Sequence, residues 1–240
     1  MQNEASDASG DFAFNNLPPG DYTLTPSKDD DDTEITAFDA SLVLQHAVQL
    51  ITLEGSAAVA ADVNDNNLIN STDAFFILEK SAGLRSLPFP GAGAVWVFEP
   101  GNRALPGLAS DVTGQDFTGI LLGDVSGNWS DQAAAGSASI AQANGSARFG
   151  VTTAKAANGD LQISRVLVQA GDDDVFGVDL KLTFDGRGVQ VTEVSSEATS
   201  AVGNANTEGI ILAAVADASG INGDEVLLTV TLETDRLREL

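Results

Sequence analysis

The sequence contains no cysteine and only one histidine among its 240 residues. Without cysteine, the chain has no disulfide bond, no zinc–thiolate site and no thiol nucleophile. A single histidine excludes a multi-histidine metal site and disfavours a serine–histidine–aspartate triad. Thiol chemistry and most histidine-based chemistries are therefore not expected of this chain.

Basic side chains are scarce as well, with 11 Lys and Arg against 35 Asp and Glu and a formal net charge of −24. Proteins bind nucleic acids and anionic membrane surfaces through basic residues, so neither is an expected partner. No run of about 18 consecutive apolar residues occurs, so no membrane-spanning helix is predicted. The acidity favours cations as ligands, or solvation in a salty medium.

Composition divides the chain into three zones and a linker. Residues 1–26 are rich in turn residues, and residues 27–130 contain an internal repeat. Residues 131–137 are small and polar, as in a linker. Residues 138–240 alternate between apolar and polar side chains, which is typical of strands.

The first zone has two strand candidates, Phe12–Phe14 and Tyr22–Leu24, joined by a run that contains Pro and Gly. Two strands are not stable alone in water. The sequence SGDFAFNNLPPGDYTLTPSK resembles the end of a carboxypeptidase-regulatory-like β-sandwich. That resemblance implies that further strands lie upstream.

The repeat in the middle zone has a spacing of 34 residues. Five positions of the first copy recur in the second: Ile35, Asp39, Ala40, Leu44 and Leu50 return as Ile69, Asp73, Ala74, Leu78 and Leu84. After each Asp, apolar residues follow at helical spacing, so both copies are predicted to form an amphipathic helix. Gly83 is expected to end the second helix. Short strands are predicted at residues 94–98 and 117–122.

The twelve residues from Asp62 to Asp73 have the composition of a calcium loop. Calcium takes about six to eight oxygen ligands, and such a loop supplies them from alternate positions. The candidate ligands are the side chains of Asp62, Asn64, Asn66 and Asp73, the carbonyl of Leu68, and a water held by Asn70. Asn67 stands where the loop needs a positive φ, which Asn tolerates next best after Gly. The alternative is an Asx-rich turn that caps the helix without a metal.

The first copy departs from this pattern. Its candidate ligands are Asp30, Asp32, Asp39 and the carbonyl of Glu34. Lys28 falls at the first ligand position and cannot bind a cation, so either Asp29 substitutes in a shortened loop or the site is weak or empty. Four adjacent carboxylates repel one another, and a cation relieves that repulsion. The alternative is a solvated acidic turn, and the sequence predicts one calcium ion and leaves a second one open.

The two loop–helix units, residues 28–85, resemble type I dockerin repeats, whose pattern is Asp-x-Asn-x-Asp-Gly-x-Ile-Asn-Ser-x-Asp followed by an amphipathic helix. Dockerin loops end on Asp, as the loops here do at Asp39 and Asp73. The resemblance implies a protein partner, a cohesin-like domain bound in cis or in trans. It also implies the partner-binding residues Ser71 and Thr72 in the second copy and Ala37 and Phe38 in the first. A place in the core is the alternative for Phe38.

The last zone is predicted to be an antiparallel β-sandwich. Its strand candidates are Ala147–Thr152, Leu161–Val168, Val178–Phe184, Val189–Val194, Ile210–Val215 and Leu228–Leu232. The run FGVDLKLTFDGRGVQVTEVSS resembles a cohesin-like or carbohydrate-binding-module-like sandwich. Residues 131–240 contain no Trp or Tyr, which counts against stacking on sugar rings, although carbohydrate remains an alternative ligand.

We therefore expect a multidomain fold, with a small α dockerin-like module of paired EF-hand-like loops and helices beside an all-β antiparallel sandwich. The expected function is a non-catalytic calcium-binding interaction module, because the acidic residues lie in turns where carboxylates stay ionised. The alternative is the accessory region of a polysaccharide-degrading enzyme. The polar residues after Met1 do not resemble a signal peptide. The chain is thus expected to be part of a longer protein, extracellular or on the surface of a bacterial or archaeal cell.

Overall fold

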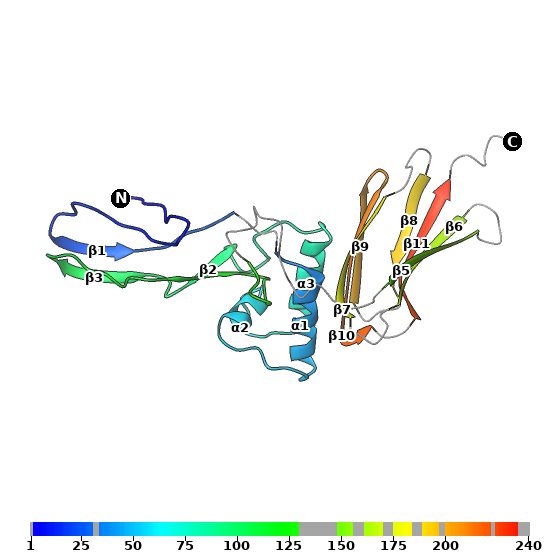
Figure 1. The fold of residues 1–240 in the computed structure, drawn as a ribbon, viewed down its shortest axis with the longest axis horizontal. Coiled ribbons are helices and arrows are strands. Elements are labelled where there is room, and N and C mark those ends of the chain that lie inside the picture. Colours follow the sequence, from blue (N-terminus) through cyan, green and yellow to red (C-terminus); the bar gives the residue numbers. More distant parts are fainter. Residues whose placement is uncertain are drawn as a thin grey trace.

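A computed structural model describes the backbone of residues 2–30, 34–129, 148–155, 161–169, 175–183, 189–196, 200–221 and 224–234. The described chain consists mostly of strands in small antiparallel sheets, with a few helices between them (Figure 1). The expectation of a β-rich protein with a small helical part is confirmed at this level. No described helix is long and apolar enough to cross a membrane.

The elements of the amino-terminal half are β1 (Gly20–Leu24), α1 (Ala37–Ala47), α2 (Ser56–Ala61), α3 (Ser71–Ser81), β2 (Trp96–Glu99), β3 (Arg103–Leu108) and β4 (Thr118–Leu121). The elements of the carboxy-terminal half are β5 (Arg148–Lys155), β6 (Leu161–Gln169), β7 (Val175–Thr183), β8 (Val189–Ser195), β9 (Ser200–Thr207), β10 (Ile210–Ile221) and β11 (Asp224–Thr234). We call the latter group the C-terminal β unit.

The two repeated helices begin in the same way. Asp39 is the third residue of α1, and its carboxylate accepts a hydrogen bond from the backbone N–H of Thr36 at 2.9 Å. Asp73 is the third residue of α3, and it accepts one from the N–H of Asn70 at 3.0 Å. Such capping satisfies N–H groups that have no partner within a helix. The two predicted helices are confirmed, and Gly83 follows α3 with a φ of +69°.

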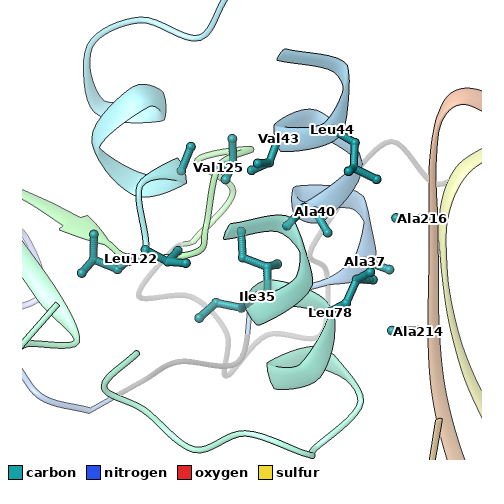
Figure 2. Packing of buried hydrophobic residues seen from close by; sticks show 14 of the residues in the cluster. Ile35, Ala37, Ala40, Val43, Leu44, Leu78, Leu122, Val125, Ala214 and Ala216 are labelled. Atoms are coloured by element: carbon teal, nitrogen blue, oxygen red, sulfur yellow. The ribbon is translucent and has the colours of Figure 1, made fainter. Parts of the chain in front are cut away.

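Apolar residues of the repeat form much of the core of the helical part, although Leu50 and Leu84 are exposed. The core residues of the helices and of the loops around them are Ile35, Ala40, Val43, Leu44, Ala74, Ile77, Leu78, Phe89, Leu122 and Val125, several of which are labelled in Figure 2. Helices α1 and α3, which we call the helix pair, therefore bury one face against each other and the loops. Helix α2 was not predicted, since six residues are too few to show a helical period.

Two small sheets flank the helices. Strand β1 pairs with β3, and β2 pairs with β4, both antiparallel. The strand expected at Phe12–Phe14 is wrong: these residues are not in a strand, and the Phe12 ring instead packs against Phe14 and Phe117 at centroid distances of 6.3 and 6.4 Å. The partner of β1 lies beyond residue 26, so hydrogen bonds cross the expected boundary between the first two zones.

The C-terminal β unit contains two antiparallel sheets, ordered β7-β10-β9 and β5-β6-β11-β8. One cluster of buried apolar side chains joins them, with Ile211 and Val215 from the first sheet and Leu228 and Val230 from the second. The predicted strands are present in this region, whereas β9 was missed because its sequence, SAVGNANT, is small and polar.

Strand β10 is buried on both faces. Ile211, Ala213 and Val215 face the cluster between the two sheets. The alternate residues Ala214, Ala216 and Ala218 belong to the core cluster of the helix pair. The sheet β7-β10-β9 therefore lies between the second sheet and the helices, as Figure 1 shows.

Candidate metal centre

The loop from Asp62 to Asp73 joins α2 to α3 and wraps around the carboxylate of Asp62. Oδ1 of Asp62 accepts a hydrogen bond from the N–H of Asn66 at 3.1 Å, and Oδ2 accepts one from Asn67 at 2.7 Å. Asn67 has a φ of +63°, the left-handed conformation that the sequence pattern required at this position, and Asp65 has a φ of +54°. The predicted loop thus has its turn where the spacing placed it.

The carboxylate of Asp73 closes the loop from inside the protein. Its side chain is fully buried, and Oδ1 accepts a hydrogen bond from Nδ2 of Asn64 at 2.8 Å. Burial raises the pKa of Asp73, the Asn70 N–H lowers it, and the negative charge of Asp62 raises it again. The two carboxylates therefore interact, and no described contact brings a basic side chain to either of them.

Asn64 presents an unsatisfied oxygen at the same place. Its Nδ2 is occupied by Asp73, while its Oδ1 is buried and has no hydrogen-bond partner. A buried polar atom without a partner costs about 1–3 kcal/mol. Carboxylates and amide oxygens are the types of donor that a hard cation prefers.

The other predicted ligands lie in the more exposed part of the loop. Oδ1 of Asn66 accepts a hydrogen bond from the N–H of Leu68 at 2.8 Å. The carbonyl of Leu68 accepts one from Nδ2 of Asn70 at 3.2 Å. The structure thus brings Asp62, Asn64 and Asp73 together, and it places the remaining three along the loop beside them. No group of three or more His, Cys, Asp or Glu side chains suited to a metal occurs in the described part of the chain. The predicted ligand positions of this loop hold two carboxylates, Asp62 and Asp73, and their other oxygens belong to amides and the backbone.

The loop lies close to Gly91, which follows α3 in the chain. A Cβ atom at Gly91 would come well within 3.0 Å of the backbone carbonyl oxygen of Asn64. Gly91 has a φ of +96°, so glycine is suited to this position for its conformation as well as its size. The position of Asn64 therefore depends on a close backbone contact.

The first-copy candidates are not brought together by the described contacts. Asp39 is fully buried; its Oδ2 accepts hydrogen bonds from the N–H and hydroxyl of Thr36, and its Oδ1 accepts one from the N–H of Ser126 at 2.8 Å. Burial raises the pKa of Asp39 to about 6. Asp30 is exposed and pairs with Nζ of Lys28 at 3.0 Å, which lowers the pKa of Asp30. Glu34 is half-buried, and Asp32 lies outside the described residues.

A partly buried turn at residues 123–129 was not assigned a role from the sequence. Asp124, which is 6% exposed, accepts hydrogen bonds from the Ser126 hydroxyl and from the N–H groups of Asn128 and Trp129 at 3.0–3.2 Å. Through Ser126 this turn also binds the carboxylate of Asp39. The signal in the sequence was the run GDVSGN, because Asp, Ser, Gly and Asn favour turns closed by side chains.

The four predicted partner-binding residues lie in two different environments. Ser71 and Thr72 are exposed at the start of α3. Ala37 is fully buried at the start of α1, where its N–H donates a hydrogen bond to Oδ2 of Asp179 in β7 at 3.0 Å. Phe38 is partly buried, and its backbone lies against Gly177 of the same strand.

Comparisons with protein-family models, with curated proteins and with solved structures return no match to this chain.

Proposed function

We propose that this chain is a non-catalytic, calcium-binding interaction protein, in which a dockerin-like helix pair is held beside a cohesin-like β-sandwich. The observation that carries the proposal is the meeting of Asp62, Asn64 and Asp73, with two carboxylates and a buried amide oxygen that lacks a partner. We infer one calcium ion at this loop. An extracellular or cell-surface location accords with calcium binding, because calcium is millimolar outside cells and fills weak sites there.

The residues of the loop would hold calcium through oxygens that the fold already positions. Asp62 follows α2, the backbone of Asn64 lies against Gly91, and Asp73 lies in the first turn of α3. Bound calcium would supply positive charge to carboxylates that now repel each other, and it would give Asn64 Oδ1 a partner. A ligand that binds only the folded state at about 100 times its Kd adds about 2.7 kcal/mol of stability.

The interaction role is supported by how the helix pair is packed. An apolar face of α1 lies against a sheet of the C-terminal β unit, with Ala37 at the contact. Helix α3 carries a proposed loop ligand in its first turn and packs against α1. It therefore couples the loop to the face of α1 that contacts the sheet. Order in the loop would thus determine the shape of a protein-binding surface.

Calorimetric titration of the metal-free intact chain with calcium tests the proposal. The variant Asp62→Asn removes a ligand charge, and Asp65→Asn is its matched control, because Asp65 is an exposed residue of the same loop at a non-ligand position. We expect Asp62→Asn to weaken binding by at least tenfold and Asp65→Asn to bind almost as the parent does. Equal binding by both variants, or no heat with the parent, would refute a calcium site in this loop.

A further inference from the structure

The start of α1 receives a carboxylate from the C-terminal β unit. Asp179 of β7 accepts hydrogen bonds from the N–H of Ala37 and from the hydroxyl of Ser81 at the end of α3. The first N–H groups of a helix have no partner within it, and a negative charge is stabilised at that end. Asp179 therefore matches the chemistry of the helix end it contacts, although it lies more than a hundred residues away in the sequence.

A second strand contacts the opposite kind of helix end. Nδ2 of Asn204 in β9 donates hydrogen bonds to the carbonyls of Ala82 and Gly83, both at 3.1 Å. These carbonyls follow the last turn of α3, where carbonyl groups lack partners within the helix. A hydrogen-bond acceptor, Asp179, thus contacts the N-terminus of α1, and a donor, Asn204, contacts the C-terminus of α3. Together the two contacts fix the orientation of the helix pair on the sheet.

Small residues bring the sheet close to the helices between these polar contacts. A Cβ atom at Gly177 would lie 2.6–2.7 Å from backbone atoms of Ala37 and Phe38, so no larger residue fits without movement of α1. Ala214 and Ala216 of β10 are fully buried opposite α1 (Figure 2). This close fit is that of a protein interior.

We propose that the sheet β7-β10-β9 is the binding partner of the helix pair, docked within the same chain, and that calcium at residues 62–73 strengthens this docking. The calcium part rests on the function proposed above. The docking part stands on the contacts of Asp179, Asn204 and Gly177 alone. The partner of the dockerin-like surface is then a neighbouring region of this chain, which covers Ala37 and leaves Ser71 and Thr72 exposed.

Helix α3 provides the connection between the loop and the docked face. Asp73 lies in its first turn, and Ser81 is its last residue. A loop that holds Asp73 firmly also holds the helix whose other end contacts Asp179 and Asn204. Linkage requires the effect to be reciprocal, so docking strengthens calcium binding by the same factor as calcium strengthens docking.

The test separates docking from the covalent connection. A protease recognition sequence is inserted within residues 131–147 of the intact chain, the chain is cleaved there, and the two halves are followed by analytical gel filtration over a dilution series. We expect the halves to remain together in calcium, and their dissociation constant to be at least tenfold weaker in chelator. Calorimetry of the uncleaved chain with calcium is run on the same preparation.

The outcomes distinguish the two proposals. Halves that separate in calcium and in chelator, while calorimetry still shows calcium binding, would overturn docking and leave the calcium site standing. Halves that remain together equally in both conditions would overturn the calcium linkage. No calcium heat would refute the function proposed above and the linkage with it, whereas halves that stay together would still establish docking.

Two interface variants make the test specific. Gly177→Ala and Asp179→Ala are expected to weaken association of the halves by at least tenfold. By reciprocity, they are also expected to weaken calcium binding by the uncleaved chain. Lys181→Ala is the matched control, because Lys181 is exposed on the same strand and two residues from Asp179. Circular dichroism before cleavage identifies any variant that fails to fold, and unchanged association in both folded interface variants would overturn the assigned surface.

Discussion

The close contact between Gly91 and Asn64 allows the calcium site to be perturbed without altering any ligand. In Gly91→Ala, the new methyl group would meet the carbonyl oxygen of Asn64 within 3.0 Å and its carbonyl carbon at 3.3 Å. Both are backbone atoms, so the contact cannot be relieved by rotating a side chain. Gly93→Ala is the matched control: Gly93 also has a positive φ, +71°, but a Cβ there meets nothing within 4 Å.

The two substitutions share one cost and differ in another. A left-handed conformation costs an alanine about 1–2 kcal/mol, which applies to both variants. Forcing an extra methyl group into a packed site costs typically about 1–3 kcal/mol more, which applies to Gly91→Ala alone. Because the displaced backbone carries the Asn64 amide, we expect this variant to lose about tenfold in calcium affinity, equivalent to about 1.4 kcal/mol.

Urea unfolding in chelator measures the loss of stability, and calorimetric titration with calcium measures the loss of calcium affinity. We expect Gly91→Ala to be less stable than Gly93→Ala and to bind calcium more weakly. Equal calcium affinity in the two variants would show that the position of Asn64 does not matter to the site. The assignment of Asn64 as a ligand would then be wrong.

Two further predictions concern buried carboxylates outside the loop: Asp39 of the first copy and Asp124 of the turn at residues 123–129. Between pH 3.8 and about 6, the unfolded chain has released the proton that folded Asp39 still holds, so stability in chelator should fall as pH rises through this window. The loss of unfolding free energy amounts to at most about 3 kcal/mol. In Asp39→Asn, stability should change much less with pH over this range. A parent whose stability rises with pH over this range would contradict the burial of Asp39. Asp124→Ala removes the acceptor for the Asn128 and Trp129 N–H groups and should cost about 1–3 kcal/mol in urea unfolding. The calcium affinity of the loop at residues 62–73 should not change in this variant. A matching loss of calcium affinity would show that the turn around Asp124 is coupled to that loop.

The features that the sequence predicted are those encoded locally. The second loop and its helix lie within twenty residues, so the turn at Asn67 and the place of Asp73 at the start of α3 follow from spacing alone. The calcium ligands of this loop stay a prediction. The repeat supported the same assignment for α1. Strands with alternating Val, Leu and Ile were also predictable, because their period of two is visible within one short segment.

Apart from the short helix α2 and the small, polar strand β9, the features that could not be predicted depend on residues far apart in the chain. Strand β3 contains Pro106 and Gly107, and it pairs with β1, which lies far away in the sequence. The second burial face of β10 consists of alanines, which are too small to mark a face by hydrophobicity. The role of Asp179 requires that β7 lie at the end of α1, and alternation along one strand carries no information on what covers its outer face.

Thermal unfolding of the intact chain, in saturating calcium and then in chelator, tests the calcium site most directly. The parent is compared with a variant in which Asp62 and Asp73 are both changed to Asn. With free calcium about 100-fold above its Kd, the added 2.7 kcal/mol should raise the Tm by about 5–10 °C, and the variant should show no calcium effect. A parent Tm that is the same in calcium and chelator would contradict the account, and the loop would then be a metal-free turn that caps α3.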